Sequence, residues 1–321
     1  MADEAPLPSL IESEGFPVTL VFAGKKAFFS ERITGNLWAV ENGQTTLIHS
    51  FPIVKITGHH ETGLLGIVLD PDFEQNNFIY CFYSYGQTLD NLKNKIVRLD
   101  VKSNTEITIL DNIPGGVIHN GGIMAFAPDK TLYIGVGIQN EIMDKSQDAN
   151  FWGGKVLRIN PDGTIPKDNP IPGSPVYSWG HRNIFGLAFH PTSGKLYVCD
   201  EGPDHDDEIN IIEKGGNYGW PEVMGKSDDP KFISPIQTYT PCITPTQCVF
   251  VNGKLYFGSY NEGTVHSLTL SGENFDAVAE DKVVYRGKSF GTIGVFYSPD
   301  KHFYITTPNK ILEFTPINEN P

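Results

Sequence analysis

Apolar and aromatic residues gather in six short segments along this chain, and each segment is rich in side chains that favour β-strands. The equivalent apolar positions of successive segments lie 48 to 64 residues apart. Five of the segments follow a turn-like tract such as Pro128-Asp129 or Asn252-Gly253. The six segments read AFFSE from Ala27, FIYCFYSY from Phe78, TLYIGVG from Thr131, KLYVCDE from Lys195, KLYFGSY from Lys254 and HFYITTP from His302.

This repeat predicts the fold. A period near fifty residues is typical of a radial repeat in which each unit is one four-stranded sheet. Six units over 321 residues predict an all-β chain, folded as a six-bladed β-propeller of four-stranded antiparallel sheets. The alternative is a large β-sandwich with chance self-similarity. A propeller is one closed domain, so we expect residues 1–321 to form a single domain, with residues 1–14 as a loose N-terminal arm.

Composition excludes two classes of partner. Lys and Arg number 24 and Asp and Glu number 38, so the formal net charge is −14. Such a surface repels nucleic acid and anionic membranes. No apolar run approaches the roughly 20 residues that span a bilayer, so we expect neither nucleic acid nor membrane as a partner.

The four cysteines bear on the cellular compartment. Cys81 and Cys199 sit in apolar strand segments and are expected to be buried thiols. Cys242 and Cys248 bracket the loop CITPTQC, and five intervening residues allow a small disulfide loop. Zinc is the weaker alternative, because no second pair lies nearby. A disulfide favours an oxidising compartment, so we expect an extracytoplasmic protein, periplasmic or secreted, whose signal peptide has been removed.

The segment DHDDE, from Asp204 to Glu208, places four carboxylates in five residues. Like charges this close repel unless a cation or solvent neutralises them. The segment therefore indicates a calcium site, with Tyr218 and Asp228 able to add oxygens from the following loop. The spacing is not that of an EF-hand, and the alternative is a solvated acidic loop.

Two further segments carry candidate chemistry. His119 lies in IHNGG, just before the third repeat strand, and imidazole titrates near neutral pH, as a general base requires. Arg182 and Asn183 follow Trp179-Gly180 and put a cation and an amide on one loop. Taken alone, a single His is more often structural, and the Arg-Asn pair is a weak signal.

Together these segments resemble the soluble quinoprotein glucose and aldose-sugar dehydrogenases, the glucose/sorbosone dehydrogenase family. The resemblance covers the chain from about residue 63 to 225, beyond which only the repeat rhythm remains. It rests on these motifs: GLLGIVLDPDF from Gly63, HNGGIMAFAPDKTLY from His119, GKVLRINPDGTIPKDNP from Gly154, GHRN from Gly180, GPDHDDEIN from Gly202 and KGGNYGWP from Lys214.

The resemblance implies a six-bladed propeller and an activity. The family oxidises the anomeric carbon of aldose sugars to a lactone, with pyrroloquinoline quinone held by calcium over the channel. A small-molecule sugar is therefore the implied substrate. His119 falls on the catalytic base, and Arg182 and Asn183 fall on the pair that contacts the quinone carbonyls. Asp207 falls on a carboxylate near the active site, and Glu61 sits where glucose dehydrogenases carry Gln.

The resemblance also implies two metal sites. Gly202 and Pro203 fall on the backbone oxygens that hold the cofactor calcium. Glu208 and Tyr218 match ligands of a second, structural calcium, with Asp228 as a third.

The sequence departs from the family where the quinone carboxylates are bound. The basic residue expected after the fifth repeat strand is replaced in GSYNEG, which offers Asn261 as the cofactor contact. The two arginines expected before the sixth repeat strand are absent from GKSFGTIGV, although Arg286 and Lys288 lie nearby. Removing one partner of a desolvated charge pair costs about 3–5 kcal/mol, so these losses weaken quinone binding unless other cations replace them.

Three functions therefore remain open. The first is a quinone-dependent sugar dehydrogenase with calcium. The second is a non-catalytic propeller that binds carbohydrate or protein and has lost the quinone site. The third, a calcium-centred lactonase, needs several side-chain ligands on the axis, and the sequence offers none outside residues 204–208. The sugar, the electron acceptor and the choice between monomer and homodimer stay open.

Overall fold

The computed structural model describes residues 7–58, 60–288 and 291–317. Each of the six repeat segments contains a strand, and the apolar position shared by the six is buried in every case, from Phe28 in the first to Phe303 in the last. These strands are β3 (Lys26–Glu31), β7 (Phe78–Tyr85), β11 (Leu132–Val136), β15 (Leu196–Asp200), β19 (Lys254–Ser259) and β23 (Phe303–Thr307).

Four separate sheets have four antiparallel strands each, paired in chain order. The first sheet contains β2 (Pro17–Ala23), β3, β4 (Asn36–Glu41) and β5 (Gln44–Ser50), and the second contains β6 (Leu64–Leu69), β7, β8 (Lys93–Asp100) and β9 (Thr105–Pro114). The third contains β10 (Met124–Phe126), β11, β12 (Lys155–Ile159) and β13 (Val176–Trp179). The fourth contains β14 (Ile184–Phe189), β15, β16 (Asp207–Ile212) and β17 (Gln237–Tyr239).

The remaining strands form one eight-stranded sheet, so the expectation of six separate four-stranded sheets is wrong. The two four-stranded runs of this sheet are joined by one parallel pairing, Gln247 with Gly294. The spacing of hydrophobic residues predicts individual strands, but it does not predict a backbone pairing between neighbouring sheets. Besides β19 and β23, the sheet contains β18 (Pro245–Val251), β20 (Thr264–Ser271), β21 (Ala277–Arg286), β22 (Gly294–Tyr297), β24 (Lys310–Phe314) and β1 (Leu10–Glu12).

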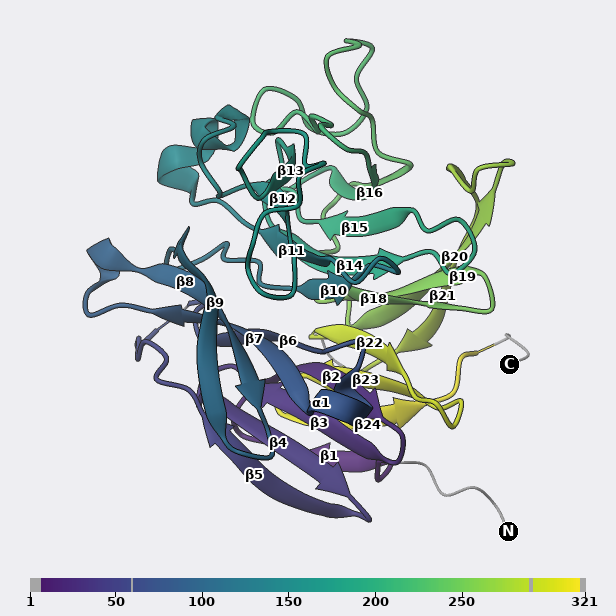
Figure 1. Cartoon of the computed structure of the whole chain (residues 1–321). Helices are drawn as coiled ribbons and strands as arrows, with labels where there is room; N and C mark the ends of the chain where they lie inside the picture. The colour runs from purple at the N-terminus through teal and green to yellow at the C-terminus, as the bar shows by residue number, and fades with distance from the viewer. Residues whose placement is uncertain (1–6, 59, 289–290, 318–321) are drawn as a thin grey trace.

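The N-terminal segment is also corrected. Residues 7–14 are not a loose arm, because β1 pairs antiparallel with β24 and Leu7 and Ile11 are buried. Residues 1–6 lie outside the described residues. In Figure 1 the first strands, in purple, lie beside the last, in yellow, so the chain closes on itself.

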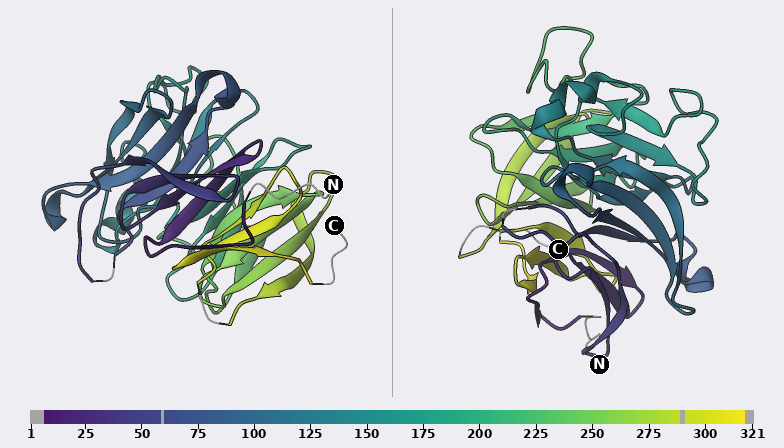
Figure 2. Two further views of the ribbon diagram at one scale, coloured as in Figure 1. Left: turned by 90° about the horizontal axis from the view of Figure 1, so that it is seen from below. Right: turned by 90° about the vertical axis from the view of Figure 1, so that its left-hand side faces the viewer.

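The sheets surround an axis, as an all-β propeller requires (Figure 1), and Figure 2 shows the molecule from two further sides. The first strand of each four-stranded run contacts the next around a closed ring: β2, β6, β10, β14, β18, β22 and back to β2. Apolar side chains fill the space between neighbouring sheets; for example, Leu132 and Ile134 of β11 share a core cluster with Tyr80 and Phe82 of β7.

Among residues 7–58, 60–288 and 291–317, helical structure is confined to three short segments, α1 (Phe73–Asn76), η1 (Leu89–Asn91) and η2 (Asn140–Gln147). In the part of the chain that the structure describes, none of them has the length and apolar character to cross a membrane.

Candidate functional site

One end of the axis holds a cavity of about 470 Å³. The ring strands begin at this end, so the residues at or just before their N-terminal ends form its wall, among them Val18, Leu65, Ile123, Phe185 and Thr246. The charged and polar lining residues come mostly from the loops around them: Arg32, His60, Glu61, Glu201, Thr244, Gln247, Tyr260 and Asn261. We call this cavity the channel site.

His119 lies against the channel site and is buried, with 4% of its surface exposed. Its backbone adopts the left-handed region (φ 57°), and its N–H donates to the Glu61 carboxylate at 2.6 Å. Its ring Nδ1 lies 3.1 Å from the carbonyl oxygen of Ile138, which can only accept, so Nδ1 carries the proton and Nε2 keeps its lone pair. Burial, and then the charge of Arg182, hold the pKa of His119 below its usual value.

A close backbone approach sets this geometry. A Cβ at Gly137 would clash with the His119 carbonyl oxygen and would lie 2.7 Å from Oδ1 of Asn183. Only glycine therefore allows the chain after β11 to pass between these two residues. The Asn183 Oδ1 is buried and has no hydrogen-bond partner within the described residues.

Two carboxylates meet at the Asn183 amide. Its Nδ2 donates to Glu201 Oε2 at 3.0 Å and approaches Glu61 Oε2 at 3.4 Å. Burial, followed by the charge of Glu61, raises the pKa of Glu201 to about 7. The site therefore holds two acids of which one is half-protonated near neutral pH.

Arg182 lies beside this pair. Its guanidinium donates to the Glu201 carboxylate at 3.2 Å and to the backbone oxygens of Glu201 and Gly202 at 3.1 and 2.9 Å. The Asp200 carboxylate accepts the backbone N–H groups of Arg182 and Asn183, the latter at 2.8 Å. Asp200 thus fixes the loop that presents both residues to the channel site.

The same carboxylate belongs to a buried network. Asp200 Oδ2 lies 3.0 Å from Nδ1 of His181, whose Nε2 lies 2.9 Å from Oγ of Ser178. The His181 ring stacks on Tyr218, with centroids 4.6 Å apart. All four side chains are at least nine-tenths buried, so this network acts as a rigid support rather than as a reactive group facing substrate.

The residues expected to bind metal are only partly brought together. The Gly202 carbonyl oxygen accepts a hydrogen bond from the Arg182 guanidinium at 2.9 Å, whereas Pro203 is exposed on the following loop. Glu208 is buried, accepts hydrogen bonds from the Gly225 N–H and the Asn210 amide, and has a pKa raised to about 8 by burial and the charge of Asp200.

The other expected ligands point elsewhere. The Tyr218 hydroxyl donates to the Ile211 carbonyl and accepts the Glu213 N–H, so it is already engaged. Asp228 is exposed. The described residues contain no group of three or more His, Cys, Asp or Glu side chains positioned to hold a metal ion.

Asp207 does not face the channel site. It is fully buried, and its carboxylate accepts the backbone N–H groups of Gly202, Ile243 and Thr244 at 2.6–2.8 Å. It therefore holds two loops together, and its expected catalytic role is not supported by this geometry. Asn261 does line the channel site, and its amide donates to the carbonyl of Cys242 at 3.1 Å.

The disulfide expected between Cys242 and Cys248 is absent. All four cysteines are free thiols. The Cys242 thiol contacts Asp207, and Cys248 contacts Cys199 of the neighbouring sheet instead. The loop is short enough to close, but the strand β18 carries Cys248 into the core. The argument for an oxidising compartment that depended on this disulfide therefore falls away.

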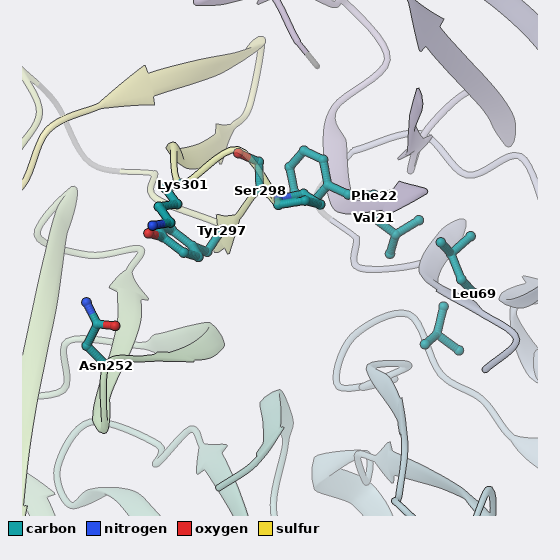
Figure 3. Close-up of a pocket in the computed structure, with 9 residues that line it drawn as sticks. Val21, Phe22, Leu69, Asn252, Tyr297, Ser298 and Lys301 are labelled. Carbon is teal, nitrogen blue, oxygen red and sulfur yellow. The ribbon is translucent and has the colours of Figure 1, made fainter. Parts of the chain in front are cut away.

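The opposite end of the axis holds a different pocket of about 1010 Å³ (Figure 3). The ring strands end there, and Val21, Phe22 and Leu69 lie on one side of it with Tyr297 and Lys301 on the other. None of the sequence-predicted site residues lines it, whereas Glu61 and Asn261 line the channel site, so the channel site is the candidate active site.

Sequence reasoning missed three charged residues of the site: Arg32, Asp200 and Glu201. Asp200 and Glu201 directly precede Gly202-Pro203, so their place in the sequence was a usable signal. Arg32 follows the first repeat strand, and nothing local marks it, because the channel site forms only when the ring closes.

The fold is an all-β propeller, and one end of its axis holds a neutral imidazole, an Arg-Asn pair and two carboxylates. Together these groups form a candidate active site in the central channel. The profile of the family described as Glucose / Sorbosone dehydrogenase matches residues 15–312. The chain therefore belongs to the glucose/sorbosone dehydrogenase family.

Relatives agree with this assignment. Quinoprotein glucose dehydrogenase B of Acinetobacter calcoaceticus is 35% identical over 235 residues, which cover 63% of this chain and 49% of that protein. Aldose sugar dehydrogenase YliI of Escherichia coli is 27% identical over 325 residues, covering 88% and 84%. The structure of the PQQ-bound aldose sugar dehydrogenase from Streptomyces coelicolor superposes with a TM-score of 0.83 at 30% identity, covering 95% of this chain and 98% of that one. The family and these neighbours are sugar dehydrogenases, so the expected oxidoreductase class is confirmed.

Proposed function

We propose that this protein oxidises the C1 hydroxyl of an aldose sugar to a lactone, with pyrroloquinoline quinone in the channel site. The observation that carries the proposal is the state of His119: a buried imidazole whose proton is fixed on Nδ1 and whose Nε2 is left as a base.

The side chains around His119 support this role. Because its pKa is lowered, the imidazole is neutral at neutral pH and Nε2 can accept the proton of the sugar hydroxyl. The Glu61 carboxylate fixes the His119 backbone and stabilises the imidazolium that results. Bound quinone would supply the two-electron acceptor that no side chain of the chain provides.

The charges of the site set the conditions for binding such a cofactor. A tricarboxylate quinone adds three negative charges to those of Glu61 and Glu201, and among the described residues of the site Arg32 and Arg182 oppose them. A divalent cation brings the net charge of the occupied site close to zero, and protonation of Glu201 makes it zero. The charges of the site therefore fit the quinone together with calcium, for which the carboxylates of Glu61 and Glu201 would supply hard oxygen donors.

The test is reconstitution with quinone and calcium, followed by gel filtration and dye reduction with several aldoses. We expect retained quinone absorbance and sugar-dependent reduction. His119→Gln should keep the absorbance and lower kcat by about 10²–10⁴-fold. The matched control His302→Gln changes an imidazole that bonds Glu313 away from the axis and should have no effect.

The pH profile gives a second readout. Activity should fall as pH drops through the pKa of His119, which lies below 6.5, because the protonated ring cannot accept the hydroxyl proton. Loss of all quinone absorbance during gel filtration, with no activity, would refute the proposal.

The second candidate is a propeller that binds carbohydrate without quinone. It is favoured by one observation: Arg286 and Lys288 are not among the residues that line the channel site, so neither replaces the missing clamp. Calorimetry that detects sugar binding to a protein unable to retain quinone would support this candidate.

A further inference from the structure

Arg32 is the one Arg or Lys among the channel-lining residues of the described chain. It comes directly after β3, and its side chain is held from two directions. The guanidinium carbon lies 4.2 Å from the centre of the Phe16 ring, and a guanidinium nitrogen donates to the His60 carbonyl. These contacts fix the side chain before any ligand arrives.

The charge of Arg32 has no compensating partner. Within residues 7–58, 60–288 and 291–317, no carboxylate lies at ion-pair distance from it. Its Nε is buried and has no hydrogen-bond acceptor among those residues. Burial lowers the pKa of the guanidinium, and the more distant charge of Glu61 offsets only part of this effect. A half-buried cation in this state is destabilising unless an anion enters the cavity.

The surroundings of Arg32 favour one kind of anion. Thr244, Gln247 and Asn261 line the same cavity and offer neutral polar groups. The guanidinium is a planar fork with five N–H donors, which matches the two oxygens of a carboxylate. Asn261 stands where the resemblance implies a basic residue, and the segment GKSFGTIGV lacks the two arginines expected there.

We propose that Arg32 binds a carboxylate group of the quinone and takes over the function of the missing clamp. This inference rests on the proposed function, since it names how that cofactor is held. In this arrangement Arg32 binds the cofactor, and His119 accepts the proton of the sugar hydroxyl.

The experiment measures quinone affinity in millimolar calcium by quenching of tryptophan fluorescence, for wild type, Arg32→Met and Arg32→Lys. We expect Arg32→Met to raise the Kd about 100-fold. Arg32→Lys keeps the charge but loses the fork, and should give an intermediate Kd. The matched control is Arg98→Met, because Arg98 also stacks on a phenylalanine ring, Phe78 at 4.3 Å, but does not line the channel site.

The trimethyl ester of the quinone provides a probe without carboxylates. Wild type and Arg32→Met should bind this ester equally weakly, which separates a lost carboxylate contact from a damaged cavity.

Two results would overturn the inference, and they have different meanings. If wild type binds quinone and Arg32→Met binds it equally well, Arg32 has no such role and the proposed function stands. If wild type shows no quinone binding in calcium, the inference and the proposed function fail together.

Discussion

The carboxylates of Glu61 and Glu201 repel each other in the metal-free protein, and Glu61→Gln should release this repulsion. Both approach the same amide nitrogen of Asn183, so their nearest oxygens lie within about 6 Å. The substituted amide can still accept the His119 N–H, so the change removes a charge and keeps the backbone contact.

The size of the effect follows from the pKa of Glu201. Its folded-state pKa is raised from 4.5 to about 7, so the folded protein binds more protons than the unfolded chain between these values. Stability therefore falls as pH rises from 4.5 to 7, by about 3 kcal/mol in total. Two charges about 6 Å apart at an effective dielectric of about 20 repel by about 3 kcal/mol, and partial solvent contact reduces this to about 1–2 kcal/mol.

The assay is urea unfolding in chelator at pH 5.5 and pH 8.5, followed by tryptophan fluorescence. Wild type should lose more stability between the two pH values than Glu61→Gln, by about 1–2 kcal/mol. The difference between the two proteins isolates this pair, because groups away from Glu61, such as Glu208, contribute equally to both. Glu74→Gln, an exposed carboxylate on α1, is the control and should follow wild type. Parallel stability curves for Glu61→Gln and wild type would refute the reasoning.

Two further predictions concern buried charges away from the channel. Lys155 is fully buried, and its ammonium donates to the carbonyls of Lys145, Ser146 and Gly153 at 2.7–3.1 Å. Lys155→Met should therefore lower the free energy of unfolding, measured in urea, by about 3 kcal/mol. An unchanged midpoint of unfolding would show that water replaces these hydrogen bonds. Glu208 has a pKa raised to about 8, so in chelator at pH 8.5 Glu208→Gln should raise Tm, and calcium should raise Tm only in wild type. Equal wild-type Tm values in chelator and in millimolar calcium would rule out Glu208 as a calcium ligand.

The sequence predicts the positions of the strands, but it does not predict every backbone pairing between them. The six repeat segments were predictable because β-branched and aromatic residues recur with the same turn tracts. The short strand β1 was missed because three residues, LIE, carry no period of their own, and only pairing with β24 makes them a strand. The join between β18 and β22 depends on one backbone pairing, which side-chain patterns do not encode.

The residues of the site were likewise predictable only in part. His119, Arg182 and Asn183 were predictable because they belong to long motifs, and the structure brings them together around the Ile138 and Gly137 backbone. Glu61 and Asn183 are 122 residues apart in sequence, so the meeting of Glu61 with Glu201 emerges only from the closed ring. The hydrogen bonds from backbone N–H groups to Asp207 were equally unpredictable, because one acidic residue within the run DHDDE gives no sign of burial.

The pairing of β1 with β24 has a consequence for the order of events during synthesis. Leu10 is synthesised well before its partner Leu312, because almost the whole propeller lies between them in sequence. The ring therefore stays open until β24 has been made, and only then does β1 gain its partner. The early strands must wait with an unpaired edge, so a chain that stalls before residue 310 leaves β1 without its partner and the cofactor without a complete binding site.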